Sequence, residues 1–133
     1  MSDKMIYAGI FLDEDDQFIG SLDKTIEHQH VTIAFKPDEE TEAVIRKHLG
    51  EEVELMVEGY GCDDDNEGLK VMIFDWDSME LMPLFDNIDI PHITISVSET
   101  GKPKDTAKLE FEDTPAFFIV GKIGYFDGRG VIV

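Results

Sequence analysis

The sequence predicts an α+β fold in which short, largely antiparallel strands outnumber the helices. Apolar runs of strand length recur along the chain, separated by turns rich in Gly, Pro, Asp and Asn. Clear helical periodicity is confined to one stretch, at residues 38–49. The chain has 133 residues, of which 42% are apolar, which is enough for one packed core. We therefore expect a single domain over 1–133.

The strands are predicted in order from period-2 alternation and from β-branched and aromatic runs. We expect them at residues 5–12, 30–35, 53–60, 69–76, 92–97, 108–112, 116–125 and 131–133. A polar turn at 61–68 lies between the third and fourth of these strands and predicts a hairpin. Residues 17–27 fit neither period, and 100–105 is expected to be a loop.

The helix at 38–49 has the start and stop signals that helices favour. Asp38 is a plausible N-cap, acidic residues fill the first turn and Gly50 is a good terminator. Its apolar face consists of Val44, Ile45, His48 and Leu49. Because this face is narrow, we expect the helix to lie on a sheet. A shorter helix is expected at 79–85, interrupted by Pro83.

The charge is strongly acidic, with 30 acidic against 11 basic residues and a net charge of −19. Such a field repels the backbone of a long nucleic acid, so a polymer substrate is disfavoured. Residues 101–133 hold five basic and five acidic residues, so the excess lies in residues 1–100. The excess of acidic residues could serve solubility alone, or it could exclude polymers while the lysine-bearing segment 101–133 admits a small anion.

Targeting signals and cysteine chemistry are not apparent. No stretch approaches the roughly 20 apolar residues of a membrane span, and the start, Met-Ser-Asp-Lys, lacks the pattern of a signal peptide. We therefore expect a cytoplasmic protein. Cys62 is the sole cysteine and receives no role. The acidic run 63–68 has Phe74 where a calcium-binding EF-hand needs an acid, which excludes that class.

Two copies of one motif carry the chemistry. The segments 30–33 and 92–95 both read H-x-T-I. Side chains alternate faces along a strand, so His30 and Thr32 share one face, and His92 and Thr94 share another. The repeat fits an internal duplication whose halves face each other across a cleft. We expect one His-Thr pair on each wall of that cleft.

Such a cleft suits the cleavage of a phosphodiester. In-line displacement needs a base on the attacking oxygen and an acid on the departing one, on opposite sides of phosphorus. An imidazole has an unperturbed pKa of about 6.5, so two histidines supply both roles near neutral pH. The two threonine hydroxyls can donate hydrogen bonds to the non-bridging phosphate oxygens. This chemistry requires no metal and no other cofactor.

At these residues the chain resembles the two-histidine (2H) phosphoesterase superfamily, whose hallmark is two H-x-[ST] motifs. The segments HVTIAFKP (30–37), PHITIS (91–96) and GKPKD (101–105) look most like the cyclic phosphodiesterase domain of fungal and plant tRNA ligases. The resemblance covers most of the chain, but the kinase and ligase regions of those enzymes are absent and the acidity is unusual.

The resemblance implies a fold, a site and an activity. The fold would be bilobal and pseudo-twofold, with two mostly antiparallel sheets facing across a central cleft and helices on the outside. His30 and His92 would be the catalytic acid and base, in an order that is not readable from sequence, and Thr32 and Thr94 would bind phosphate. The activity would be the opening of a 2′,3′-cyclic nucleotide or of a small cyclic oligonucleotide.

Further candidates lie around the motifs. Possible substrate-binding residues are Tyr7, Lys36, Lys102, Lys104 and Tyr125. Exposed lysines are more often only solvated, and strand tyrosines more often pack in the core. His28 could suggest a metal site, but without a third ligand nearby a surface histidine is the simpler interpretation.

A hydrolase is the favoured interpretation of the sequence, and two others stay open. A single H-x-T strand motif is most often structural. The chain could also be a non-catalytic protein that sequesters a cyclic nucleotide in the same cleft. It could also be an acidic inhibitor that imitates nucleic acid. Sequence gives neither the substrate nor the oligomeric state.

Overall fold

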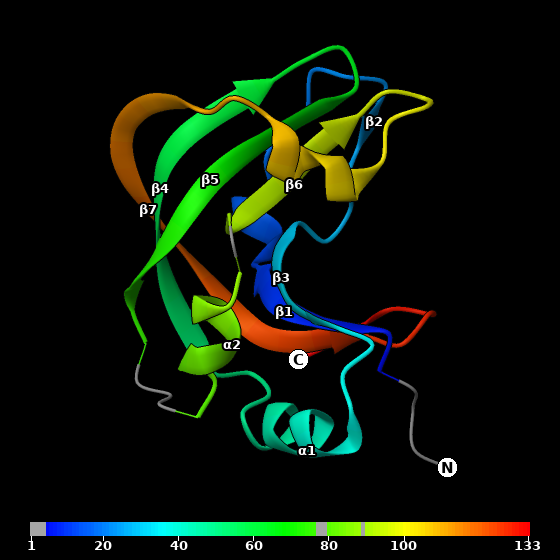
Figure 1. Ribbon diagram of the computed structural model, residues 1–133, viewed down its shortest axis with the longest axis vertical. Coiled ribbons are helices and arrows are strands. Elements are labelled where there is room, and N and C mark those ends of the chain that lie inside the picture. The colour runs from blue at the N-terminus through cyan, green and yellow to red at the C-terminus, as the bar shows by residue number, and fades with distance from the viewer. Residues whose placement is uncertain (1–4, 77–79, 89) are drawn as a thin grey trace.

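A computed structural model describes residues 5–76, 80–88 and 90–133 (Figure 1). In this part of the chain the strands are β1 (Tyr7–Leu12), β2 (Lys24–Thr25), β3 (His30–Phe35), β4 (Glu52–Cys62), β5 (Asn66–Asp75), β6 (His92–Val97), β7 (Glu112–Phe126) and β8 (Val131–Ile132). The α-helices are α1 (Glu39–Lys47) and α2 (Met82–Asp86), and the 3₁₀ helices are η1 (Glu14–Asp16) and η2 (Pro103–Lys108). The α+β class is therefore confirmed.

All eight described strands belong to one antiparallel sheet with the order β2-β6-β5-β4-β7-β1-β3, and β8 pairs with β7. Two separate sheets were predicted, and this part of the prediction is wrong. The physical reason is the length of β4 and β7, which have 11 and 15 residues and pair with each other through the middle of the molecule. Their ladder joins what would otherwise be two sheets.

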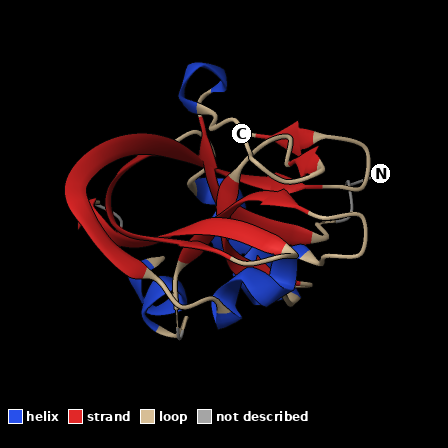
Figure 2. Ribbon diagram, turned by 90° about the horizontal axis from the view of Figure 1, so that it is seen from above, coloured by secondary structure: helices blue, strands red, loops and turns tan. Residues whose placement is uncertain are grey.

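The sheet bends strongly. The strands β4, β5 and β7 form a tall curved wall on the left of Figure 1, with α1 and α2 near its lower end. Seen from above, the long strands curve around one side and most loops lie on the other (Figure 2). This curvature brings β3 and β6 close together, although they lie near opposite ends of the strand order. The pairing of β2 with β6 continues past β2, where the backbone N–H of Ile26 donates to the Ile95 carbonyl at 2.8 Å.

One hydrophobic core underlies the sheet. Alternation along β4 buries Val53, Leu55 and Val57 completely. Other core side chains come from β1, α1, the start of α2, β6 and β7, namely Ile10, Ile45, Leu81, Ile93 and Ile123. Each fully buried side chain of this size contributes about 1.5–3 kcal/mol of hydrophobic stabilisation. The histidine motifs are therefore mounted on strands whose opposite face is anchored in the core.

The predicted helix is confirmed as α1. The Asp38 carboxylate caps it by accepting a hydrogen bond from the Thr41 backbone N–H at 2.8 Å. Gly50 follows with a φ of +80°, a conformation that glycine adopts without strain. The second predicted helix corresponds to α2, which tolerates Pro83 in its first turn. Met79, where that helix was predicted to begin, lies outside the described residues.

Two strand predictions need correction. The strand expected at 108–112 is not formed, because η2 extends to Lys108 and β7 begins only at Glu112. Thr106 and Leu109 are buried, so the chain packs here through its side chains rather than by strand pairing. The strand expected at 116–125 is instead the longer β7. It accommodates Pro115 where its pairing with β4 is interrupted.

The predicted hairpin is confirmed as β4 and β5, but its turn is shorter than expected because β5 already begins at Asn66. In the described part of the chain, neither α-helix has the length and apolar character needed to cross a membrane.

Candidate functional site

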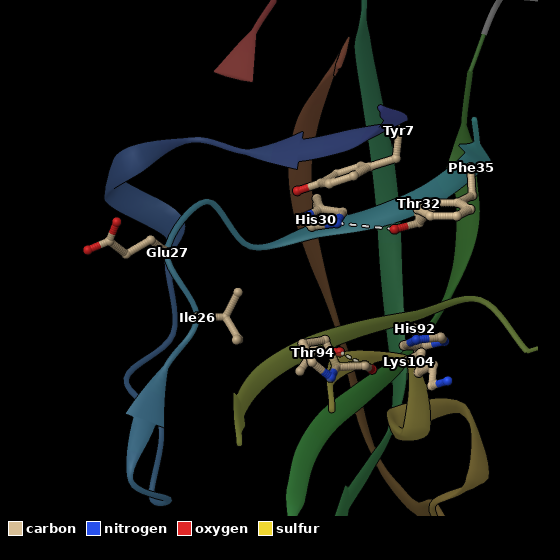
Figure 3. Close-up of a pocket in the computed structure, with 10 residues that line it drawn as sticks. Tyr7, Ile26, Glu27, His30, Thr32, Phe35, His92, Thr94 and Lys104 are labelled. Atoms are coloured by element: carbon tan, nitrogen blue, oxygen red, sulfur yellow. Dashed lines mark hydrogen bonds between the residues drawn. The ribbon is translucent and has the colours of Figure 1, made fainter. Parts of the chain in front are cut away.

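A pocket of about 460 Å³ lies between β3 and β6 (Figure 3). It is lined by Tyr7, Ile26, Glu27, His30, Thr32, Phe35, His92, Thr94, Pro103 and Lys104. Both H-x-T motifs, which are 62 residues apart in the sequence, therefore meet at one pocket. Strand alternation explains this, because the intervening Val31 and Ile93 are 1% and 0% exposed and point into the core.

The two histidines are held in the same way. His30 Nδ1 lies 2.8 Å from the carbonyl oxygen of His28, and His92 Nδ1 lies 2.8 Å from that of Ile90. A carbonyl oxygen only accepts hydrogen bonds, so Nδ1 carries the proton in both rings. The second nitrogen, Nε2, is therefore the one that remains to exchange protons in each ring. Each motif thus uses the carbonyl two residues earlier to select one tautomer.

The backbone of His28 is adapted to this contact. Its φ is +55°, in the left-handed region that non-glycine residues rarely adopt. This conformation costs about 1–2 kcal/mol for an ordinary residue. The carbonyl of the same residue holds the His30 ring, so the unfavourable conformation occurs where it serves the site.

The His30 ring packs against two neighbouring aromatic side chains, stacked on Tyr7 and tilted relative to Phe11. Its centroid lies 4.8 Å from that of Tyr7, at an interplanar angle of 20°, and 4.9 Å from that of Phe11, at 33°. Burial lowers the pKa of His30, and the charges of His92 and His28 lower it further, against the opposing effect of the His28 carbonyl. Around neutral pH His30 is therefore predominantly neutral, with an Nε2 lone pair available to accept a proton.

The two threonines of the motifs are in different environments. Thr32 is exposed, and its Oγ1 lies 3.1 Å from His30 Nε2. Thr94 is only 9% exposed, and its Oγ1 lies 3.1 Å from the Pro103 carbonyl and 2.8 Å from Thr106 Oγ1. The second motif is therefore packed against η2, whereas the first is open to the pocket.

No protein-family model matches the sequence, and no curated protein matches it either. The chemical interpretation of the site therefore rests on its residues.

The other candidate substrate-binding residues differ in whether they line the pocket. Tyr7 and Lys104 line the pocket, but Lys36 and Lys102 do not. Lys36 is exposed, with its Nζ 5.4 Å from the centroid of the Phe35 ring. Lys102 is also exposed, and its backbone carbonyl accepts a hydrogen bond from Asn66 Nδ2 at 2.7 Å.

Tyr125 also does not line the pocket, so the structure does not bring this candidate together with the two motifs. It is 2% exposed, and its hydroxyl accepts a hydrogen bond from Arg46 Nη1 at 3.0 Å. The Arg46 guanidinium also lies over the Tyr125 ring, at 4.9 Å from its centroid. This tyrosine therefore connects α1 to β7.

Sequence reasoning missed four lining residues, namely Ile26, Glu27, Phe35 and Pro103. Ile26 and Glu27 belong to the segment 17–27, which showed no periodicity that could place them. Phe35 is 67% exposed at the end of β3, and a large exposed aromatic beside the motif was the one available signal. Proximity to the predicted Lys104 could have suggested Pro103.

The charges that line the pocket suit a single small anion. Lys104 carries a positive charge and His92 can carry one, and Glu27 is the one carboxylate among the lining residues. The remaining lining is mainly apolar or aromatic. A pocket of this size is in the range of about 300–1,000 Å³ that holds small ligands. The arrangement can therefore bind one phosphate group together with a flat or apolar substituent.

Proposed function

We propose that this protein hydrolyses a small cyclic phosphodiester by acid–base catalysis from His30 and His92. The observation that carries this proposal is that two imidazoles line one pocket, each with Nδ1 held by a carbonyl and Nε2 left to exchange protons. The substrate class is a nucleoside 2′,3′-cyclic phosphate or a small cyclic oligonucleotide. We also propose that the chain has the pseudo-twofold site of the two-histidine phosphoesterases.

The arrangement of the four motif residues supports that symmetry. In Figure 3 the strands β3 and β6 cross the view one above the other, with His30 and Thr94 toward one side and Thr32 and His92 toward the other. The order of histidine and threonine is thus reversed between the two strands. A twofold axis through the pocket would produce this reversal, and it would place the two imidazoles on opposite flanks of a bound phosphate.

The lowered pKa of His30 favours the role of general base for this residue. Its neutral Nε2 would accept a proton from water while the water oxygen forms a bond to phosphorus. The bond from phosphorus to the ring oxygen would break, and that oxygen would take a proton from His92 Nε2. Return of the two protons through solvent restores both histidines, and the product is a phosphate monoester.

The electrostatics favour a small substrate. The pocket offers one carboxylate against Lys104 and the acid His92, whereas the whole chain carries −19. A compact monoanion can enter such a pocket, but a long polyanion meets the field of the whole molecule. This supports a mononucleotide or a short cyclic oligonucleotide over a folded RNA.

A substrate panel tests the proposal. The purified protein would be incubated, with a chelator present, with nucleoside 2′,3′-cyclic phosphates, linear 2′-5′ dinucleotides and cyclic oligonucleotides. We expect turnover of at least one compound and a bell-shaped pH profile. His30→Ala and His92→Ala should each lose about 10²–10⁴-fold in kcat, whereas Thr100→Ala, outside the pocket, should retain it.

Each other outcome has a definite meaning. Equal turnover by wild type and the double histidine variant would refute the mechanism. Binding without turnover, with the ligand recovered intact by chromatography after denaturation, would instead identify a sequestering protein. Loss of activity in the presence of the chelator, restored by added metal, would contradict a reaction driven by the histidines alone.

A further inference from the structure

Three polar side chains form a continuous chain from the interior to the pocket. Asn66 at the start of β5, Thr106 in η2 and Thr94 in β6 are 2%, 0% and 9% exposed. Asn66 Nδ2 donates to Thr106 Oγ1 at 3.1 Å, and Thr106 Oγ1 lies 2.8 Å from Thr94 Oγ1. Among these residues, Thr94 alone belongs to a motif. The other two lie outside the pocket lining.

The direction of these hydrogen bonds follows from counting protons. Asn66 Nδ2 has two N–H groups, and it donates to the Lys102 carbonyl at 2.7 Å and to Thr106 Oγ1. Thr106 Oγ1 thus accepts one hydrogen bond, and its own proton lies in a fully buried position where it needs an acceptor. Thr94 Oγ1 is at 2.8 Å and can be that acceptor. The Thr94 proton is then directed to the Pro103 carbonyl at 3.1 Å.

This order has a consequence for Thr94. A hydroxyl has one proton and two lone pairs, and the Thr106 proton occupies a lone pair of Thr94 Oγ1. Accepting a hydrogen bond also polarises a hydroxyl and strengthens its own donation. Pro103 lines the pocket, so a water molecule there can replace the Thr94 hydroxyl as the donor to the Pro103 carbonyl. The Thr94 proton can therefore turn from Pro103 to an anion in the pocket.

We infer that Asn66 and Thr106 are positioning residues that keep the Thr94 hydroxyl oriented as a hydrogen-bond donor to the bound phosphate. This inference rests on the proposed function, because it assigns to Thr94 a phosphate oxygen as its partner in the reaction. Neither residue touches the substrate in this arrangement. Both act through Thr94, which lines the pocket.

The surrounding backbone is shaped for this contact. Gly68 in β5 is paired with Thr94, and a Cβ at Gly68 would lie 2.3 Å from Thr106 Cγ2 and 2.7 Å from the Ile93 carbonyl. Such distances are far too short for real contacts, so the absence of a side chain lets η2 approach β5 and β6. The approach brings the Thr106 hydroxyl to Thr94.

Within the described residues, Thr32 of the first motif is not part of a hydrogen-bonded chain like that of Asn66, Thr106 and Thr94. Thr32 is exposed, and its hydroxyl contacts His30 Nε2, a group that gains and loses a proton during the proposed reaction. The two threonines would therefore differ in role. Thr106 would keep Thr94 a donor whatever the protonation state of the histidines, whereas the orientation of Thr32 would depend on the protonation state of His30.

Variants of Thr106 separate a positioning role from a structural one. Thr106→Val keeps the shape but removes the hydroxyl, whereas Thr106→Ser keeps the hydroxyl. With the best substrate of the panel, we expect Thr106→Val to lower kcat about 10-fold with little change in KM, since the lost interaction strengthens in the transition state. Thr106→Ser should restore most of the rate. Thr94→Val should lose at least as much as Thr106→Val.

A double variant tests whether Thr106 acts through Thr94. If it does, Thr94→Val combined with Thr106→Val should be no slower than Thr94→Val alone. Asn66→Asp tests the direction of the hydrogen bonds. In this variant a carboxylate oxygen replaces the Asn66 N–H donor, so it would accept the Thr106 proton and draw it away from Thr94. We expect a lower kcat there too. This variant also keeps the inference testable if Thr106→Val does not fold.

Binding of inorganic phosphate, measured by calorimetry, separates failure of this inference from failure of the proposed function. Two results would overturn the positioning role and leave the proposed function standing. One is a kcat of Thr106→Val equal to that of an active wild type. The other is a double variant whose loss of kcat equals the product of the losses in Thr94→Val and Thr106→Val. If the wild type neither turns over any compound nor binds phosphate, the proposed function falls and the inference with it. Phosphate binding that weakens in Thr106→Val but not in Thr106→Ser would support the inference without turnover.

Discussion

At the scale of single residues, the site depends on how each imidazole is held. His30 and His92 have the same Nδ1 contact but different surroundings, since His30 packs against Tyr7 and Phe11. This packing removes water from around the ring and so disfavours its charged form. A difference in environment between two chemically identical groups is a common way of assigning them different roles in acid–base catalysis.

The position of His28 leads to a prediction for His30. The pKa of His30 should be below its ordinary value of 6.5, and His28→Asn should raise it because the charge of His28 is removed. Asparagine tolerates the left-handed backbone, so the carbonyl contact should persist. The measurement is a titration of the imidazole C–H signals by NMR. A His30 pKa that is unchanged in His28→Asn would contradict this electrostatic account.

His28→Gly is the matched variant, because it removes the same charge and also the backbone strain. We expect the same upward change in the pKa of His30, together with an increase in the free energy of unfolding of about 1 kcal/mol from the relaxed conformation at φ +55°. Part of that gain is offset by the greater freedom of glycine in the unfolded chain. Denaturant unfolding of both variants would measure the difference.

At the scale of elements, one buried carboxylate connects three strands and the segment before β2. Glu67 is 5% exposed. It accepts hydrogen bonds from the Ser21 backbone N–H at 2.8 Å, the Ser21 hydroxyl at 3.0 Å, the Ser96 hydroxyl at 2.7 Å and the Tyr60 hydroxyl. This ties Ser21 to β4, β5 and β6, and the same segment continues to the pocket residues Ile26 and Glu27.

Glu67 predicts a pH dependence of stability. Burial by itself would raise the pKa of Glu67, but hydrogen bonds from Tyr60, Ser21 and Ser96 together hold the pKa below its ordinary value of 4.5. A lowered folded pKa means that the stabilisation is complete above the unfolded pKa and is lost as pH falls through the folded pKa. Below pH 4.5 the wild type should therefore lose stability more steeply than Glu67→Gln.

At pH 7, Glu67→Gln should destabilise the fold by about 2 kcal/mol, because a charged acceptor of several hydrogen bonds is replaced by a neutral one. Denaturant unfolding at several pH values checks both statements. Glu99→Gln, an exposed change in the loop after β6, is the control and should leave the slope unchanged. Equal slopes for wild type and Glu67→Gln would contradict the account.

Gly68→Ala gives a second prediction at this scale. The added methyl group must displace Thr106 or the β6 backbone, and crowding of this kind typically costs about 1–3 kcal/mol of stability. Unfolding measurements would show the loss. Gly130→Ala is a suitable control, because nothing lies within 4 Å of a Cβ there and its φ is not in the left-handed region.

The elements also show what sequence could and could not reveal. Strand alternation was enough to place His30 with Thr32 and His92 with Thr94, since that relation is local. The segment 108–112 was mispredicted because its apolar residues lie against Gly59 and Gly61 of β4, a contact that is not visible from the local pattern. Neither Glu67 nor Asn66 could be identified, because their partners lie up to 46 residues away.

At the scale of the whole molecule, the two motifs lie near opposite ends of the order of one continuous sheet. The α+β class and the strands of both motifs were predictable, but the single sheet was not. A sequence repeat suggests two similar halves and says nothing about how they are joined. Here the join is made by β4 and β7, whose lengths exceeded the predicted strands.

The continuous sheet predicts cooperative unfolding. Because β4 and β7 pair along most of their length, neither half can lose its structure without exposing the core of the other. Fluorescence of Trp76 and far-UV circular dichroism should therefore report the same denaturant midpoint. Midpoints that differ between the two signals would show that the halves unfold separately.

The carboxylate of Glu27 in the pocket lining bears on how a catalytic cycle would end. Opening a cyclic diester turns one negative charge into about 1.5–2 at pH 7. The Glu27 carboxylate is exposed and points away from the two histidines in Figure 3, so at longer range it would repel the monoester more strongly than the diester and favour departure of the monoester. Neutralising that residue in Glu27→Gln should make the proposed activity more sensitive to inhibition by its own product.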